Sequence, residues 1–406
     1  MQPLLISGMA VASSLGVGTA NTAAAIREQR CGLAPCRFET VTLQTWVGEV
    51  ADVDKVGIEP SVAAFDCRNN RLAQMALRSD GFEAAVERLK ERYGPSRIGV
   101  FVGTSTAGIL QTEIAYRHRD AAGRLPAGFD YGRTHNTFSV ADFTRQLLGL
   151  AGPALAVSAA CASSAKVFGN ASRMIESGLI DAAVVGGVDT LCLTTLYGFD
   201  SLELVSNEPC RPFDARRRGI SIGEAAGYAI LERLPADVDA EAVVFAGIGE
   251  SSDAHHMSSP HPQGAGARAA MEQALQVAAL EPAQVDYINL HGTGTPSNDA
   301  AEDHAVFDVF GAGVAASSTK GATGHTLGAA GILEAIICAL AIRHGIAPGG
   351  INTTAPDPAL RTRYLRENLR MRIDRTLSNS FGFGGSNCAL VLARVASLPA
   401  ARLAPR

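Results

Sequence analysis

The sequence predicts an α/β protein with layers of helices packed on buried, largely parallel sheets. Two observations predict this class. Short apolar segments alternate with longer helical ones along the chain, and hydrophobic residues make up 47% of the 406 residues against 18% that are charged. The 42 glycines also suit tight turns and close packing of helices on sheets. A chain of this length holds roughly two or three domains.

The first expected strand lies near the N-terminus, in the segment MQPLLISGMAVASSLGVG. No basic residue precedes its apolar part, so we interpret it as a strand and a glycine turn, not as an export signal. Further strands are predicted where short apolar runs end in glycine or polar residues, at 97–103, 181–187, 227–232, 242–250 and 285–292. Helical periodicity predicts helices over 71–94, 165–178, 267–280 and 329–345. Residues 376–395 predict a strand, a glycine loop and a second strand.

No low-complexity linker divides the chain. A segment rich in Ser, His and Pro at 251–265 is the best candidate for a boundary, which gives an N-terminal half, 1–250, and a C-terminal half, 251–406. The longest apolar run begins at Leu327 and contains Glu334. It is too short for a membrane span, so it predicts a core helix.

The net charge of -5 excludes the basic excess that is typical of nucleic-acid binders. The eight cysteines match no CxxC metal pattern and are too sparse for a disulfide scaffold. We therefore expect reduced thiols in a cytoplasmic protein. His255, His256 and His261 have poor spacing for a metal site, and we expect no metal.

Cys161 lies in VSAACASSA, where an apolar strand meets a helical segment. At a helix N-terminus the dipole stabilises a thiolate, which predicts a thiol pKa below its ordinary value of about 8.5. Free backbone N–H groups at such an end also hold an oxyanion. The small neighbours leave room for a substrate. The alternative is a buried cysteine that acts as a small hydrophobic residue.

Three later segments also carry reactive side chains. His291 ends a strand and precedes a loop with Thr293 and Thr295, while Lys320 and His325 flank a glycine turn. For each segment alone, an ordinary surface or turn role is the competing interpretation. In combination, a cysteine, two histidines and a lysine indicate thiol nucleophilic catalysis assisted by imidazole hydrogen bonds.

The segment NSFGFGGSN, 379–387, alternates Phe and Gly. Such a loop suits a gate over an apolar tunnel, with Phe381 and Phe383 as the flaps. The alternative is a tight turn whose phenylalanines belong to the core.

Taken together, these segments resemble the β-ketoacyl-acyl carrier protein synthases, the condensing enzymes of the thiolase superfamily. The resemblance rests on five segments in family order: SAACASSA (158–165), RPFDARRRGISIGEAAG (211–227), HGTGTPSND (291–299), STKGATGHTLGAAG (318–331) and NSFGFGGSN. Many relatives have Gly-Phe in place of Gly219-Ile220, and Gly-Glu-Gly in place of 223–225. These departures bear on the pocket shape and leave the reactive set intact.

The resemblance implies a thiolase-like five-layered αβαβα fold from two similar halves, usually dimeric. It implies an acyltransferase without cofactor that condenses a cysteine-bound acyl chain with malonyl carrier protein and releases CO2. The implied roles are a nucleophile, Cys161; enolate stabilisers, His291 and His325; an organising pair, Lys320 with Glu302; an oxyanion hole from the Cys161 and Phe383 backbone N–H groups; a gate, Phe383 with Phe381; and pantetheine contacts, Thr293 and Thr295.

The resemblance also implies an acidic carrier-protein partner. Arg68, Arg71 and Arg211 are the expected docking residues, to which the run 216–218 could add. The alternative is that each is an ordinary solvated surface arginine. Residues 250–275, together with YINLHGTGTPSND (287–299), are similar to the synthases of aryl-polyene pathways, which extend conjugated polyenoyl chains. In such systems the partner subunit can be a homologous chain-length factor, so either a homodimer or a heterodimer is expected.

Two other functions remain open at this stage. A thiolase acting on CoA esters would need a second catalytic cysteine, for which Cys388 is the candidate. A synthase subunit that is active only with its partner, or a non-catalytic one, is the other. A dinucleotide-dependent oxidoreductase is disfavoured because no early GxGxxG follows a strand.

Overall fold

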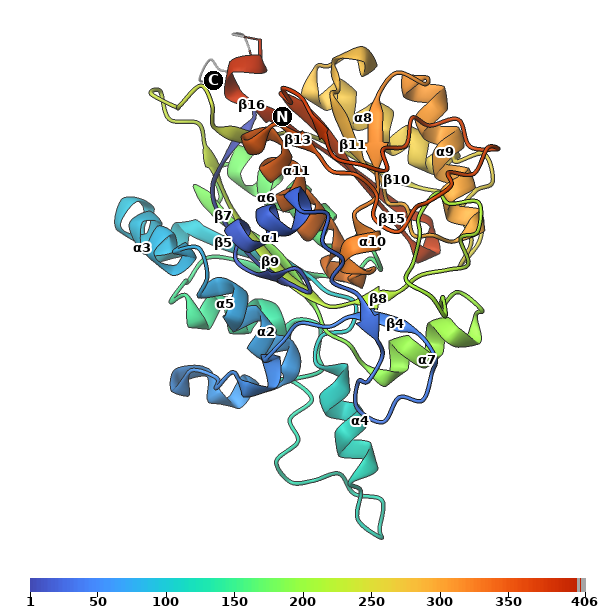
Figure 1. The fold of residues 1–406 in the computed structure, drawn as a ribbon. Coiled ribbons are helices and arrows are strands. Elements are labelled where there is room, and N and C mark those ends of the chain that lie inside the picture. Colours follow the sequence, from blue (N-terminus) through green and yellow to red (C-terminus); the bar gives the residue numbers. More distant parts are fainter. Residues whose placement is uncertain (400–401, 403–406) are drawn as a thin grey trace.

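The computed structural model describes residues 1–399 and Arg402 (Figure 1). Its main sheet has 11 strands in the order β12-β11-β15-β16-β10-β1-β9-β7-β5-β6, with β2 paired to β1. The strands of this sheet are β1 (Leu4–Ser13), β2 (Gly16–Val17), β5 (Ile98–Gly103), β6 (Ala154–Val157), β7 (Ala182–Asp189), β9 (Ala225–Arg233), β10 (Val243–Ser252), β11 (Tyr287–Asn289), β12 (Ala315–Ser317), β15 (Arg375–Gly382) and β16 (Ser386–Arg394).

Two small sheets and a set of helices complete the fold. The small sheets contain β3 (Ala34–Pro35), β4 (Trp46–Gly48) and β8 (Ile222–Gly223), and β13 (Ile346–Ala347) with β14 (Leu369–Arg370). The α-helices are α1 (Thr19–Arg27), α2 (Arg68–Leu77), α3 (Phe82–Tyr93), α4 (Ile109–Arg117), α5 (Ser139–Leu147), α6 (Ser163–Glu176), α7 (Leu193–Ser201), α8 (Ala265–Ala278), α9 (Pro296–Phe310), α10 (Lys320–Thr323) and α11 (Ala330–His344).

The two ends of the main sheet repeat one topology. In the first half, β6, β5 and β7 run parallel, and β9 and β1 follow antiparallel. In the second half, β12, β11 and β15 run parallel, and β16 and β10 follow antiparallel. Antiparallel pairing of β1 with β10 joins the halves. The expectation of largely parallel sheets is therefore wrong, because strands buried on both faces are apolar runs in either direction.

The elements form five layers, as the resemblance implied. Helices α6 and α11 lie in the middle and contact strands of both halves. Figure 1 shows α2, α3 and α5 on the outer face of the first half, and α8 and α9 on that of the second. The middle layer is thus covered by one half of the main sheet on each side, which buries the start of α6 and most of α11.

Helix α11 accounts for the longest apolar run. The segment Leu327–His344 is long and apolar enough to cross a membrane by length and composition, so the expectation that this run is too short is wrong. However, 89% of it is buried inside the protein. This burial confirms the prediction of a core helix. Glu334 lies within it and is 2% exposed.

The expected helix over 71–94 is wrong, because two helices, α2 and α3, occupy this region. Asp80 (φ 56°) and Gly81 (φ 68°) adopt left-handed backbone between them, which ends α2 and starts α3. The Asp80 carboxylate also accepts hydrogen bonds from the backbone N–H and hydroxyl of Thr19. The helical periodicity of 71–94 gave no indication of this turn.

The expected boundary at 250/251 falls inside β10, which topology assigns wholly to the second half. We infer that the halves meet in residues 234–242, between β9 and β10. The sequence signal at 251–265 marks a loop that follows β10 instead.

Candidate active site

A tight turn between β6 and α6 positions Cys161. Ala160 adopts left-handed backbone (φ 47°), and the Ser163 hydroxyl donates to the Ala160 carbonyl at 2.6 Å. The same hydroxyl accepts the Ala159 N–H at 2.9 Å. Cys161 therefore lies just before the start of the central helix α6, 6% exposed. Its predicted place at a helix N-terminus is confirmed.

Glu302 on α9 holds the loop that carries His291. Its carboxylate accepts the backbone N–H groups of His291 and Gly292, both at 2.7 Å, and the side-chain amide of Asn379 at 3.0 Å. Burial raises the pKa of Glu302 to about 7, and these donors oppose the shift. Glu302 thus fixes the backbone of the loop and does not contact an imidazole ring.

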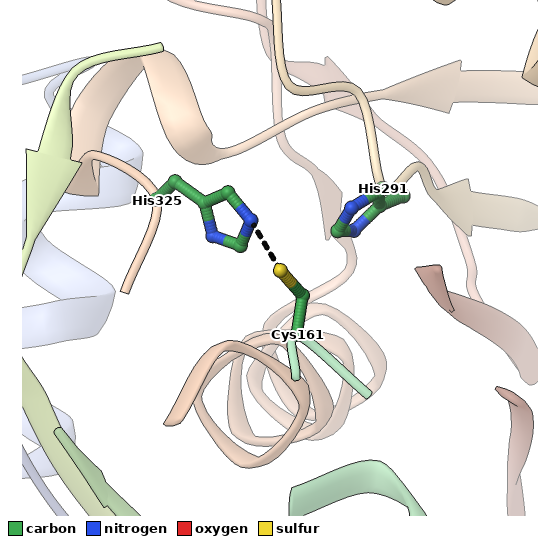
Figure 2. Close-up of side chains that lie close together, drawn as sticks. All are labelled: Cys161, His291 and His325. Carbon is green, nitrogen blue, oxygen red and sulfur yellow. Dashed lines mark hydrogen bonds between the residues drawn. The ribbon is translucent and has the colours of Figure 1, made fainter. Parts of the chain in front are cut away.

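His325 lies beside Cys161, with Nε2 3.1 Å from the sulfur (Figure 2). Its backbone is anchored by Ser221, whose carbonyl accepts the His325 N–H at 2.7 Å. The backbone N–H of Leu327 donates to Nδ1 at 3.2 Å. Because Nδ1 accepts this bond, the proton of the neutral ring resides on Nε2, which donates toward the sulfur.

Lys320 supports the second imidazole. Its Nζ donates to the His291 carbonyl at 2.6 Å and lies 3.4 Å from His291 Nδ1. Its carboxylate partner is Glu334, and the expected pairing with Glu302 is wrong. Glu334 on the middle helix α11 faces the ammonium, whereas Glu302 is engaged by backbone amides. The ammonium can only donate, so it also favours the Nε2–H form of His291.

The ligand-type atoms of Cys161, His291 and His325 all lie within 4.8 Å of one another. The two imidazole rings meet edge to face at 5.3 Å. Their spacing alone would suit a metal ion. However, hydrogen bonds from Leu327 and Lys320 engage both Nδ1 atoms and leave protons on the Nε2 atoms, where a metal would need a lone pair. The cluster is better suited to donating two hydrogen bonds.

Burial dominates the electrostatics of this cluster. Desolvation raises the pKa of the Cys161 thiol to about 12, although the positive charge of Lys320 lowers it. The predicted low thiol pKa is therefore wrong, since a helix terminus contributes at most about 2 kcal/mol. Burial, with the charge of Lys320, holds the pKa of both His291 and His325 well below 6.5.

These shifts predict a pH dependence for Cys161 alkylation. Only the thiolate reacts, so its rate of modification by iodoacetamide should rise about tenfold per pH unit between pH 7 and 9. No plateau is expected, because the pKa lies near 12. Peptide-level mass spectrometry separates this residue from exposed Cys31. A plateau below pH 8 would show that the helix terminus outweighs burial.

A pocket leads to the sulfur, and its wall includes the expected gating loop. The rings of Phe383 and Phe199 pack at a tilt with their centroids 5.5 Å apart, and the Phe381 ring lies 5.7 Å from the His291 ring. The Phe383 backbone N–H donates to the Cys161 thiol and lowers its pKa. The lining residues are Cys161, Phe199, Leu204, Ile220, Asp253, 258–260, His291, Thr293, Thr295, 297–298, His325, 381–385 and Asn387.

Thr293 and Thr295 lie on the pocket wall, with their hydroxyl oxygens 2.9 Å apart. The expected thiolase cysteine, Cys388, is fully buried in β16 and does not line this pocket. The structure therefore brings together the predicted synthase residues and leaves out the residue on which the thiolase interpretation depends.

The expected docking arginines are less accessible than the sequence suggested. Arg68 is 6% exposed and donates to the buried Glu224 carboxylate, so its expected docking role is wrong. Its position on a helix gave no sign of this long-range ion pair. Arg71 pairs with Asp66 at 2.6 Å. Arg211 pairs with Glu208.

A buried thiol before a central helix, with imidazoles from two loops of the other half, defines a thiolase-like condensing enzyme. The chain belongs to the β-ketoacyl synthase family: the "Beta-ketoacyl synthase, N-terminal domain" matches residues 1–237 and the "Beta-ketoacyl synthase, C-terminal domain" matches 242–354. The 3-oxoacyl-[acyl-carrier-protein] synthase 2 of Coxiella burnetii is 34% identical, over 97% of this chain and 98% of the relative.

Solved structures agree with this assignment. The ketosynthase (ApeO) in complex with its chain length factor (ApeC) from Xenorhabdus doucetiae is 35% identical with a TM-score of 0.87, covering 97% of this chain and 98% of that one. The ishigamide ketosynthase/chain length factor is 30% identical with a TM-score of 0.88, covering 97% and 99%.

Proposed function

We propose that the protein is a β-ketoacyl-acyl carrier protein synthase that joins a Cys161-bound acyl chain to malonyl carrier protein. The observation that carries this is the pair of neutral imidazoles, both held as Nε2–H donors, around a thiol at the end of an open pocket. No metal or redox cofactor has a part in the proposed cycle, which we place in the cytoplasm.

In the first half-reaction, the Cys161 sulfur attacks the thioester carbonyl of an acyl carrier protein. The Cys161 thiol gives up its proton as the new S–C bond forms, and the pantetheine thiolate leaves and takes up that proton. The thiol is protonated at rest, since burial raises its pKa. Backbone N–H groups of Cys161 and Phe383 support the developing oxyanion, as the contact of the Phe383 N–H with the sulfur suggests.

In the second half-reaction, malonyl carrier protein enters past Thr293 and Thr295. The C–C bond to the carboxylate breaks and CO2 leaves, so no strong base is needed. His291 and His325 donate hydrogen bonds to the enolate oxygen, and their low pKa values keep them neutral. The enolate carbon then attacks the acyl-enzyme, and the Cys161 thiolate leaves and takes up a proton from solvent.

The substrate class that we propose is a conjugated polyenoyl chain, as in aryl-polyene synthesis. Support comes from the loop after β10, which resembles that pathway type and lines the pocket through 258–260. Ile220, which replaces a phenylalanine of many relatives, also lines the pocket and leaves more width there.

The test of this function is a condensation assay with malonyl carrier protein and a panel of saturated and polyenoyl carrier thioesters. We expect one CO2 per β-ketoacyl product, with faster turnover of polyenoyl chains. Turnover of saturated chains alone would contradict the polyene assignment. Condensation of CoA esters without CO2 release would contradict the synthase function and favour a thiolase.

An open basic groove offers a docking place for the acidic carrier protein. Arg211, Arg216, Arg217 and Arg218 line it. Its wall adjoins the loop that carries Thr293 and Thr295, because the Gly219 N–H donates to the Gly294 carbonyl at 3.0 Å. Arg217 is largely buried beside two aspartates, whereas Arg216 has 67% of its side chain exposed and Arg218 is also exposed. Arg216 and Arg218 therefore replace Arg68 in the docking proposal.

Charge reversal at Arg216 and Arg218 together is expected to raise KM for the carrier protein by tenfold or more, about 1.4 kcal/mol. Added salt should shrink the difference, because exposed charges are screened. Arg372→Glu is the matched control, since Arg372 is 66% exposed and pairs with an aspartate two positions away. An equal effect of the control, or an unchanged KM, would contradict docking at this groove.

The free edge of the main sheet suits a partner chain of the same family. Strand β6 ends the sheet, and Leu155 on it is 39% exposed. The opposite edge strand, β12, is covered by a bridge from Tyr364. An uncovered strand edge with apolar side chains favours pairing. We propose that a second copy or a chain-length-factor homologue covers β6. Light scattering tells the two apart: a dimer of the protein alone indicates a second copy, and a dimer that forms only after the homologue is added indicates the homologue.

A further inference from the structure

Asp189, the last residue of β7, is fully buried and gathers hydrogen bonds from two loops. From the loop after β5 it accepts the Thr104 hydroxyl at 2.6 Å, the Ser105 hydroxyl at 2.5 Å and the Thr106 N–H at 2.9 Å. From the segment before α11 it accepts the Gly328 N–H at 2.5 Å. Asp189 does not line the pocket that reaches Cys161.

The segment that Asp189 holds before α11 also donates a hydrogen bond to His325. Leu327 adopts left-handed backbone (φ 54°), which is strained for a residue with a side chain. Its N–H nevertheless donates to His325 Nδ1. A Cβ on Gly328 would lie 2.7 Å from the Asp189 carboxylate, so the contact requires glycine. The carboxylate therefore stabilises a turn that would otherwise relax.

We propose that Asp189 is a positioning residue that sets the tautomer of His325 through the Leu327–Gly328 turn. The carboxylate holds the Gly328 N–H, the turn aims the Leu327 N–H at Nδ1, and the proton of the ring stays on Nε2. The proposal rests on the proposed function, since enolate stabilisation needs the Nε2–H donor. It extends that function to a residue that never touches the substrate.

The test reads the tautomer directly in protein labelled with ¹⁵N in the histidine rings. Long-range ¹H–¹⁵N spectra show which ring nitrogen carries the proton, and His325→Gln assigns the signals. We expect the Nε2–H form in the wild type and a mixture in Asp189→Asn, because the new amide can present an N–H to Gly328. The rate of malonyl decarboxylation should fall about 10- to 100-fold with KM unchanged.

Asp303→Asn is the matched control. Asp303 is 2% exposed and holds a loop through the backbone N–H groups of Arg361 and Thr362, none of which lines the pocket. It should lower stability without moving the His325 tautomer or the decarboxylation rate. If Asp189→Asn does not fold, Ser105→Ala tests the same link, since the Ser105 hydroxyl bonds Asp189 and accepts the Gly328 N–H.

For Ser105→Ala we expect a smaller tautomer shift in the same direction, with a rate loss of about threefold. A wild-type ring with its proton on Nδ1 would overturn the proposal. An unchanged Nε2–H form in Asp189→Asn would also overturn it. If Asp189→Asn does not fold, an unchanged Nε2–H form in Ser105→Ala would overturn it instead. The tautomer is measured without substrate, so failure of this proposal is distinct from failure of the condensation assay.

Discussion

Cys161→Ala is expected to lose condensation by a factor on the order of 10³ or more. No other cysteine lines the pocket among the residues that the structure describes, so nothing can take over the acyl chain. Decarboxylation of malonyl carrier protein should persist, because His291 and His325, and not the thiol, stabilise the enolate. The measurement is product formation and CO2 release, followed in parallel.

Cys388→Ala is the control for that variant. Cys388 is fully buried in β16, outside the pocket, and its replacement should leave condensation nearly unchanged. A large loss in Cys388→Ala, with exchange of CoA esters abolished, would contradict the synthase account and restore the thiolase interpretation. Loss of both activities in Cys161→Ala would mean that the thiol has a part in decarboxylation.

Glu334→Gln is expected to lower the free energy of unfolding by about 3–5 kcal/mol, because it leaves the Lys320 ammonium buried without a carboxylate. Lys320 and Glu334 are 1% and 2% exposed, so water cannot replace the partner. In the intact pair, Lys320 Nζ lies 3.4 Å from His291 Nδ1. Without the Glu334 carboxylate, the ammonium would also shift away from this nitrogen. Decarboxylation should therefore fall along with stability, which urea unfolding and CO2 release measure separately.

The double variant Lys320→Met with Glu334→Leu separates the two effects. Replacing both members of a buried ion pair by apolar side chains of similar size restores much of the stability. Activity should stay low, because His291 Nδ1 has lost the donor that fixes its tautomer. Recovery of both stability and activity would contradict a role for Lys320 in setting the imidazole.

Much of the site was predictable because its reactive residues lie in compact local patterns. The small residues around Cys161 and the Gly-Thr repeats after His291 point to a substrate pocket at strand and helix ends. The five-layered architecture followed from the family resemblance. Local strand patterns could not give strand direction, so the mixed sheet was missed.

The supporting residues were harder to predict because their partners are distant in sequence. Glu334 is a single carboxylate in an apolar helix, and that isolation is the signal that could have marked it as a buried ion-pair partner. Asp189 contacts loops that are 83–85 and 139 positions away. Arg68 looked like a surface charge on a helix, whereas its partner Glu224 lies 156 positions away.

The thiol pKa shows why position alone does not determine reactivity. A helix N-terminus lowers a thiol pKa, but burial between the two halves of the main sheet raises the pKa of Cys161 to about 12. The two effects oppose each other, and only the structure gives the depth of burial. The neutral thiol beside a neutral His325 follows from this balance.

The most direct test of the central claim is the intact mass of the protein after incubation with a polyenoyl carrier-protein thioester. The account predicts a mass increase of one acyl group, located on the Cys161 peptide and absent in Cys161→Ala. The acyl group should disappear when malonyl carrier protein is added, as the β-ketoacyl product forms. An acyl group on another residue, or no mass increase even with the partner subunit present, would contradict the account.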